Sequence, residues 1–392
     1  MPSPSFLEMR NRNAINILMA VRESPGMSRA ELSKVCDLAK STVSSIVDQL
    51  TGANILTESG PKPSVSGRRA VGLVFNPTCR FSIGMSIDND RIECALSDLD
   101  GELVATRRKR IQRNLDSDAL ASMAVQELGK LLASKSPAAK GFVGLGIAAP
   151  GPITPSLLSN LNGIPLNLEK LAKHLIERLS LNCRPVFDSN TNMAAIAECR
   201  RGKGSEGEIT VVVRLGTEVR AAVMKDRELL RGCQGLAGNI GHIVAPGKAL
   251  DCNCGRSGCI NAVAGTDSIV AICKALGVEI QQIDDVIAAA KAGETRCRKT
   301  LDVAATAIGY GIACAVNIIA PAEVIITGKL VEAGGCMQAP MEAALRGYCS
   351  ILNGCNLVYS FEDHYSEAVG ASLAPLLNSS FLASLVSVSG TT

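Results

Sequence analysis

The sequence lacks the long apolar run that a membrane-spanning helix needs. Hydrophobic residues make up 47% of the 392 residues, which suffices for a large buried core, but no run reaches the roughly 18–20 residues that cross a bilayer. The N-terminus, MPSPSFLEMRNRN, also lacks the charged and then apolar layout of a signal peptide. We therefore expect a cytoplasmic protein without a membrane partner.

The sequence also lacks the marks of a disulfide framework and of strong overall charge. Its 15 cysteines are odd in number, and most stand singly in apolar stretches, as Cys94, Cys199 and Cys273 do. Without a secretion signal, such thiols behave as small hydrophobic side chains. The net charge of +3 is small, but the excess lies within residues 1–77, where nine Lys or Arg face six Asp or Glu.

Histidine is scarce, and its position is therefore informative. Of the three histidines, His242 alone stands near a dense group of cysteines, formed by Cys252, Cys254 and Cys259. One imidazole and three thiolates are the ligand set of a closed tetrahedral zinc site, which is structural rather than catalytic. We predict a structural Zn²⁺ ion held by these four residues; the alternative is three unrelated thiols beside a loop histidine.

The N-terminal segment has the pattern of three short helices. Apolar residues along 11–23 fit one face of a helix, which a Ser-Pro-Gly turn ends. Ser28, with Glu31 three residues later, predicts a capping box at the start of a second helix over 28–35. A short turn leads to a third helix over 39–50, whose apolar residues face inward.

Small polar side chains at the start of this third helix are typical of a helix-turn-helix that binds DNA. They can contact phosphates or base edges, and a lysine adds positive charge. Two strands follow, and their Gly-, Pro- and Ser-rich turn carries basic residues where a wing would follow the DNA. The predicted DNA-contacting residues are Lys40, Ser41, Thr42, Ser44, Ser45, Lys62, Arg68 and Arg69. Residues 1–77 thus form a predicted winged helix-turn-helix domain; a protein-binding module with a solvated polar face is the alternative.

From about residue 79 the pattern changes to strand hairpins that alternate with helices, and this arrangement occurs twice. It predicts an α/β protein of two similar lobes with a cleft between them. We place the first lobe at 78–190, completed by 376–392. The second lobe, with the zinc site and the surface for association, is placed at 191–375.

Three motifs together resemble the ROK family of repressors, open reading frames and kinases. They are GIAAPGPI at 146–153, NTNMAAIAE at 190–198, and GLAGNIGHI at 235–243 with the cysteine run that follows it. The resemblance covers essentially the whole chain, and the winged helix-turn-helix, an α+β domain, is similar to the family's repressor branch. It implies an actin/hexokinase-like, ribonuclease-H-like fold for the two-lobed body.

The residues that the family's kinases use for phosphoryl transfer are replaced in this chain. The first phosphate loop, glycine-rich in the family, contains Asp88-Asn89-Asp90, whose carboxylates repel a polyanion. The second reads Gly216-Thr217-Glu218-Val219-Arg220, without the later glycines. Asn190 aligns with the catalytic aspartate, and a neutral amide cannot accept a proton. Asp188 could replace it only if the alternation at the strand end were broken. We therefore predict no enzymatic activity.

The resemblance also implies a sugar pocket beside the metal. Two family glutamates correspond to Asn239 and Asn261, so that with Asn190 all three acidic positions are amides, which donate and accept hydrogen bonds without charge. By the same resemblance His242 contacts the sugar with one edge of its ring and the metal with the other, and Asn162 is a further candidate. Two interpretations stay open: a sugar or an acidic sugar derivative binds here, or the pocket is empty.

These features predict a transcriptional repressor of carbohydrate-related genes that binds double-stranded operator DNA as a homodimer or homotetramer. Closure of the lobes over a ligand would alter the spacing of the DNA-binding domains and hence their affinity for DNA. Two other functions stay open. One is an active or bifunctional sugar kinase with a DNA-binding arm, and the other is a regulator or interaction platform that needs no ligand.

Overall fold

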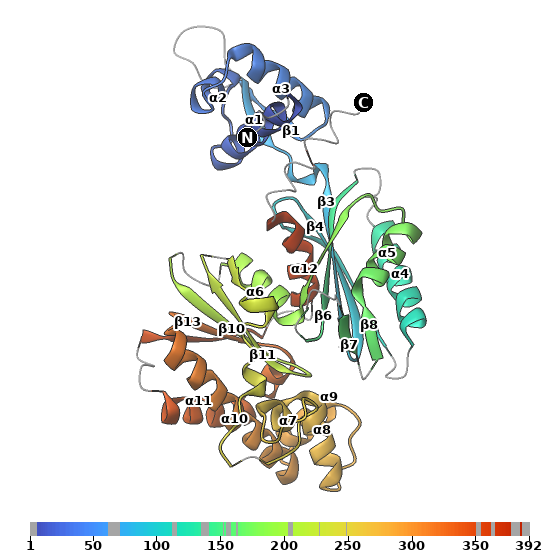
Figure 1. Cartoon of the computed structure of the whole chain (residues 1–392), viewed down its shortest axis with the longest axis vertical. Coiled ribbons are helices and arrows are strands. Elements are labelled where there is room, and N and C mark those ends of the chain that lie inside the picture. Colours follow the sequence, from blue (N-terminus) through green and yellow to red (C-terminus); the bar gives the residue numbers. More distant parts are fainter. Residues whose placement is uncertain are drawn as a thin grey trace.

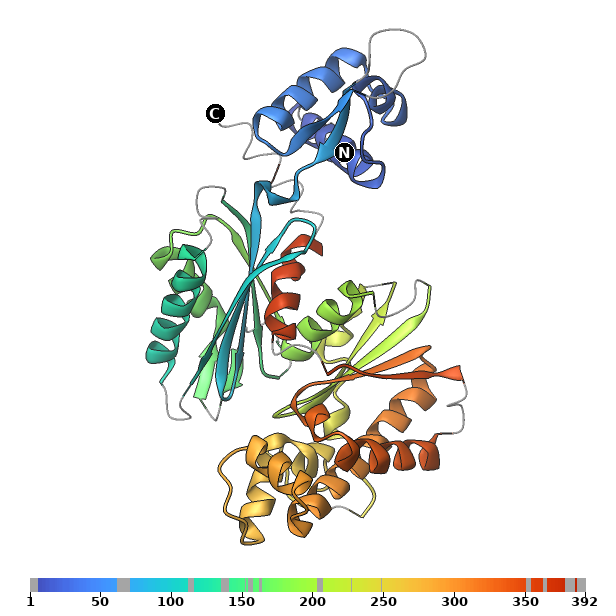
Figure 2. The same cartoon turned by 180° about the vertical axis from the view of Figure 1, so that it is seen from behind.

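Three units follow one another along the long axis of the molecule (Figure 1). A small helical module is followed by two α/β lobes, and Figure 2 shows the same order from behind. The structure is a computed structural model that describes residues 6–61, 71–111, 116–134, 141–151, 153, 158–161, 164–202, 207–226, 228–247, 249–349, 354–361, 365–377 and 385.

The N-terminal module has the elements of a winged helix-turn-helix. These are α1 (Phe6–Glu23), α2 (Arg29–Val35), α3 (Lys40–Gly52) and the antiparallel strands β1 (Leu56–Pro61) and β2 (Val71–Phe75). The capping box predicted at Ser28 and Glu31 is confirmed, because each side chain accepts a hydrogen bond from the other residue's backbone amide. The apolar side of α3 is fully buried against α1 and α2.

The first lobe is built on a five-stranded mixed sheet. Its spatial order is β5 (Leu103–Arg110), β4 (Arg91–Asp98), β3 (Phe81–Asp88), β6 (Phe142–Ala149) and β9 (Arg184–Ser189). The first three strands are antiparallel, and β6 and β9 run parallel to β3. One face is covered by α4 (Ser117–Ala133) and α5 (Leu168–Arg178), and a short hairpin, β7 (Leu158–Leu161) and β8 (Ile164–Asn167), lies beside them.

The second lobe repeats this sheet. Its order is β12 (Glu228–Leu230), β11 (Val219–Lys225), β10 (Ile209–Leu215), β13 (Glu323–Thr327) and β14 (Asn356–Tyr359), again three antiparallel strands followed by two parallel ones. The helices on its outer face are α7 (Ile260–Ala264), α8 (Thr266–Ala275), α9 (Ile283–Lys291), α10 (Thr295–Ile319) and α11 (Gly335–Tyr348). The prediction of two similar α/β lobes is confirmed.

Two helices lie between the sheets (Figure 1), α6 (Asn190–Arg200) and α12 (Ser366–Leu377). The C-terminal helix α12 packs on the first sheet, so the chain returns to the first lobe at Ser366, whereas the sequence placed this return at 376. Glycines allow the close approach: a side chain at Gly84 or Gly146 would stand 1.9 Å from a carbonyl oxygen of α12. The helix is therefore held tightly against the sheet.

Among the described residues, α10 is long and apolar enough to cross a membrane by length and composition, although we expected no such segment. Its buried residues belong to the core of the second lobe, where they pack with those of α7, α8, α9 and α11. The helix contains many Gly, Ala and Cys residues, which are small and weakly polar. Their small size permits close packing against the neighbouring helices. We conclude that α10 is the central core helix of this lobe.

The core of the N-terminal module provides the first prediction. Val47 of α3 is completely buried, so Val47→Asp places a carboxylate among apolar side chains and should destabilise the module by about 3 kcal/mol or more. Hydrogen exchange of α1 to α3, followed by mass spectrometry, measures this module separately from the lobes. Val35→Asp is the matched control, because Val35 is 64% exposed. Equal protection of α1 to α3 from hydrogen exchange in the two variants would contradict the predicted core.

Candidate metal and ligand site between the lobes

The four predicted metal ligands lie together in the second lobe. The ligand atoms of His242, Cys252, Cys254 and Cys259 all lie within 4.8 Å of one another. His242 Nδ1 is 3.7 Å from Cys252 Sγ, and the sulfur atoms of Cys254 and Cys259 are 3.6 Å apart. Sulfur atoms bound to one tetrahedral zinc ion are about 3.8 Å apart. The donor set and its spacing therefore fit such an ion.

Tight turns bring these ligands together. His242 ends the short helix η4 (Ile240–His242), and Cys259 immediately precedes α7. Between them, Gly255 has a φ of +85°, which favours glycine, and the Cys252 amide donates to the Arg256 carbonyl at 2.8 Å. The cluster thus fixes the loop that leads into α7.

The environment of the cluster favours two of the protonation states that a metal requires. A hydrogen bond from the Arg256 amide lowers the pKa of Cys254 to about 7, which favours the thiolate. Burial lowers the pKa of His242 and keeps the imidazole neutral. Burial raises the pKa of Cys259 to about 11, so this thiol must release its proton when a metal binds.

The predicted ligand-binding amides lie at the inner edge of both lobes. Asn190 starts α6; its Nδ2 donates to the Ile87 carbonyl at 3.0 Å, and its Oδ1 is buried without a partner. Asn261 accepts from the Val219 amide at 2.8 Å. Asn239 is exposed and accepts a hydrogen bond from Arg220. Three of these predicted residues, Asn239, His242 and Asn261, thus surround the start of β11. Asn162 lies outside the described residues.

Asp188, the substitute considered for a catalytic base, is fully engaged. One carboxylate oxygen accepts from Asn192 at 2.6 Å and from the Ser189 amide at 2.7 Å. The other forms an ion pair with Arg231, which belongs to the second lobe. The ion pair of Asp188 with Arg231 thus joins the two lobes.

A buried ion triad joins the lobes where the resemblance placed the phosphate loops. Arg214 of β10 contacts Asp88 of β3 and Glu367 of α12, each at 2.5 Å, and all three side chains are at most 10% exposed. The Thr217 hydroxyl donates to Asp88 at 3.3 Å. Although burial alone would raise it, the cations of Arg214 and Arg91 hold the pKa of Asp88 below its ordinary value. The carboxylate expected to repel a polyanion is therefore neutralised within the protein.

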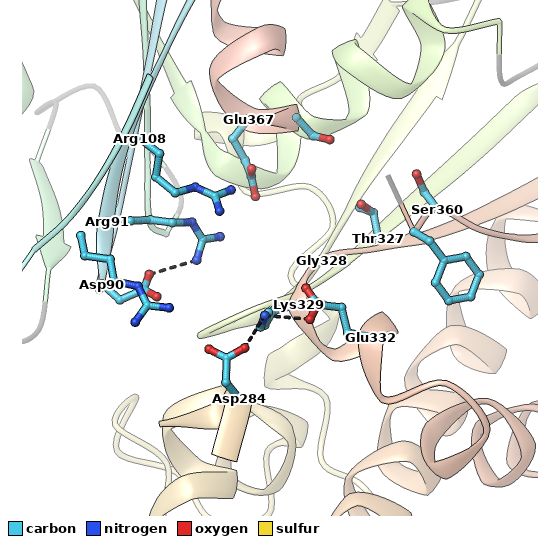
Figure 3. A pocket seen from close by; sticks show the side chains of 13 residues that line it. Asp90, Arg91, Arg108, Asp284, Thr327, Gly328, Lys329, Glu332, Ser360 and Glu367 are labelled. Carbon is cyan, nitrogen blue, oxygen red and sulfur yellow. Dashed lines mark hydrogen bonds and ion pairs between the residues drawn. The ribbon is translucent and has the colours of Figure 1, made fainter. Parts of the chain in front are cut away.

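Further cations line the cleft next to this triad, as Figure 3 shows. Arg91 pairs with Asp90 at 3.0 Å. Lys329 pairs with Asp284 at 2.5 Å and with Glu332 at 2.8 Å. Opposite charges are thus paired within each lobe at the opening of the cleft, which leaves little unbalanced charge to attract a polyanion.

No sequence pattern indicated the partners of Arg214 and Arg231. Arg214 stands in VVVRLG, a run typical of a buried strand. A charge in such a run needs a buried partner, and that is the signal which could have identified Arg214 as an ion-pair residue. No comparable signal marks Arg231, which follows a short, half-exposed strand.

The described part of the predicted DNA-binding surface lies on α3. Lys40, Ser41 and Ser45 are exposed, and Thr42 and Ser44 are half-buried. The Ser44 carbonyl accepts a hydrogen bond from Arg29 of α2 at 3.3 Å, which helps to set the angle between the two helices. The predicted wing residues Lys62, Arg68 and Arg69 lie outside the described residues.

Comparison with known proteins gives consistent results. Residues 82–374 match the ROK family. The chain is 28% identical to the xylose repressor of Caldicellulosiruptor bescii over 82% of this chain and 84% of that protein. It is 27% identical to the xylose repressor of Bacillus subtilis over 91% of this chain and 92% of that one. The solved structure of a ROK family transcriptional regulator, a homologue of the Escherichia coli MLC protein, is similar in fold with a TM-score of 0.74, at 21% identity over 97% of this chain and 98% of that chain.

The metal cluster provides the second prediction. Cys254→Ser, or removal of metal by a chelator, should lower the melting temperature by at least about 5 °C, because the 242–259 loop loses its cross-link. Metal analysis should find about one zinc ion per chain. Cys233→Ser is the control, since Cys233 is an exposed thiol outside the cluster. A melting temperature that neither treatment changes would exclude a structural metal.

Proposed function

The chain belongs to the ROK family, and on that premise we propose that it is a transcriptional repressor of sugar-utilisation genes. The observation that supports this most is the helix-turn-helix with an exposed polar face on α3, joined to a ROK body. Relatives matched over more than 90% of this chain, the module included, are named as a xylose repressor and as the transcriptional regulator NagC of E. coli. The predicted partner is double-stranded operator DNA.

Two DNA-binding modules at a fixed spacing are needed to read a palindromic operator. We therefore propose a homodimer or homotetramer, in which the lobes provide the association surface. The proposed effector site is the cleft between the lobes, with Asn190, Asn239 and His242 as its predicted ligand-binding residues.

The metal in this proposal is Zn²⁺, held by His242, Cys252, Cys254 and Cys259. It supplies a fixed cross-link in the loop beside the ligand site, not a reactive centre. Nδ1 of His242 faces the cysteines, so the opposite edge of the ring is left for a ligand. Cys259 directly precedes α7, which carries Asn261. The metal therefore positions both His242, which binds it, and Asn261, which follows one of its ligands.

Movement of the lobes can reach the DNA-binding module through α6 and α12. The first turn of α12 carries Glu367 of the ion triad, and its last turn reaches Leu376, which packs against the apolar cluster of the N-terminal module. Helix α6 begins at Asn190 and ends at Arg200, which lines a small cavity together with Arg22 of α1. Arg22 is in turn paired with Asp100 at 3.2 Å. Both helices thus connect the cleft to the module.

An active sugar kinase is the alternative, and a relative 25% identical over 69% of this chain is named as a glucokinase, from Halalkalibacterium halodurans. We expect no phosphorylation of glucose or xylose with Mg·ATP, because Asn190 is neutral and Asp188 is paired with Arg231. The same assay on Asn190→Asp should stay negative, since Arg214 and Asp88 still form an ion pair where the resemblance placed the phosphate loops. Turnover by the unaltered protein would refute the non-enzymatic proposal.

DNA binding is tested with the protein's own upstream DNA in an electrophoretic shift and by fluorescence anisotropy. Lys40→Ala should weaken DNA binding several-fold, because Lys40 is exposed at the start of α3. It should also reduce the slope of the logarithm of the binding constant against the logarithm of the salt concentration by about one. Lys291→Ala removes an exposed lysine from the second lobe and should bind as the unaltered protein does. If no upstream DNA shifts, the interaction-platform alternative is favoured instead.

A further inference from the structure

Arg220, the second residue of β11, is a buried cation without an ionic partner among the described residues. Arg220 is only 4% exposed. Its Nη1 donates a hydrogen bond to Asn239 at 3.0 Å, and its Nε is buried with no hydrogen-bond partner. Burial lowers the pKa of Arg220, and the nearby Glu218 raises it. No ion pair within 4.0 Å joins the two, and a guanidinium stays charged at neutral pH.

Arg220 faces the same side of its sheet as the helix that carries Asn190. Ala222 and Met224, which alternate with it along β11, pack with residues of α6. The hairpin before Arg220 is fixed at Asp88 through Thr217, and Asn190 is fixed at the adjacent Ile87. The start of β11 and the start of α6 therefore meet at the same end of β3.

Asn190 is the second buried side chain here with an unused polar atom. It is 3% exposed, and its Oδ1 has no partner. A buried polar atom left unpaired destabilises a protein, so native structures seldom contain one without a role. Arg220 and Asn190 come from different lobes and leave one donor and one acceptor unused. A ligand that accepts from Arg220 Nε and donates to Asn190 Oδ1 would satisfy both atoms.

The charges around the pair favour an anion. Asp188 is compensated by Arg231, Asn239 and Asn261 are neutral, and Glu218 lies near Arg220 without forming an ion pair with it. A planar guanidinium matches the two oxygens of a carboxylate or a phosphate, whereas amides match hydroxyl groups. A neutral sugar would leave Arg220 without an anion in direct contact.

We propose that the effector is an acidic monosaccharide, whose carboxylate or phosphate binds Arg220 and whose hydroxyl groups bind Asn190 and Asn239. This inference rests on the proposed function, because it names the class of effector for the same cleft. It makes Arg220 the residue that selects acidic over neutral sugars.

Isothermal titration of the full chain tests this with D-glucose and D-xylose as neutral probes, D-glucuronate and D-gluconate as carboxylates, and D-glucose 6-phosphate as a phosphate. At least one acidic probe should bind about tenfold or more tightly than either neutral sugar. The carboxylate and phosphate arms show which anion the site prefers. Equal affinity for neutral and acidic sugars, or no binding of any probe at millimolar concentration, would overturn the proposal.

Variants at Arg220 test the role of this side chain. Arg220→Met should weaken the best acidic probe about tenfold or more, and Arg220→Lys should retain part of the affinity, since it keeps the charge without the planar fork. Lys225→Met is the control, because it removes an exposed cation from the other end of the same strand and should change nothing. Unchanged binding by a folded Arg220→Met protein would refute the role of Arg220.

A second variant avoids dependence on the folding of Arg220→Met. Asn239 is exposed, and Asn239→Asp keeps its shape while it places a carboxylate 3.0 Å from Arg220. This carboxylate should compete with an acidic probe for Arg220 and weaken the binding of that probe about tenfold. If no acidic probe binds but the protein still shifts its upstream DNA, only the acidic effector is refuted. If the DNA shift fails as well, the proposed function is refuted too.

Discussion

The guanidinium group of Arg214, buried between Asp88 and Glu367, determines how the two lobes sit against each other. It comes from β10 of the second lobe, and its two carboxylates come from β3 and α12 of the first. Removing one member would leave an uncompensated buried charge, which typically costs about 3–5 kcal/mol. Two further contacts join the lobes, from Thr217 to Asp88 and from Arg231 to Asp188.

The same triad ties the cleft to the DNA-binding module. Glu367 lies in the first turn of α12, and this helix cannot shift easily against the first sheet, because glycines of β3 and β6 let its backbone carbonyls approach within 1.9 Å of the positions where side chains would begin. A change in the position of Arg214 should therefore move α12 together with the first sheet, and with them the contact of Leu376 with the N-terminal module. An effector that alters the lobe angle thus has a rigid element through which to act.

Much of the fold could be predicted because its signals are local. The capping box at Ser28 spans four residues, the zinc ligands lie within one loop, and the repeated strand hairpins follow from alternation along short segments. The ion triad could not be predicted in this way, since Arg214 meets partners 126 and 153 residues away. The hydrogen bond from Arg220 to Asn239 could not be predicted either, because the two residues are 19 positions apart. Long-range pairing of buried charges depends on how the lobes pack, which no local pattern records.

Titration of the protein with Mg·ATP tests most directly whether side chains have taken the place of a nucleotide in this cleft. With Arg214, Asp88 and Glu367 paired inside the protein and Lys329 paired at its opening, we predict no saturable heat of binding at millimolar nucleotide. Saturable binding of Mg·ATP in the micromolar range would show that the cleft still accepts a nucleotide and would contradict the view that the ion pairs have replaced it.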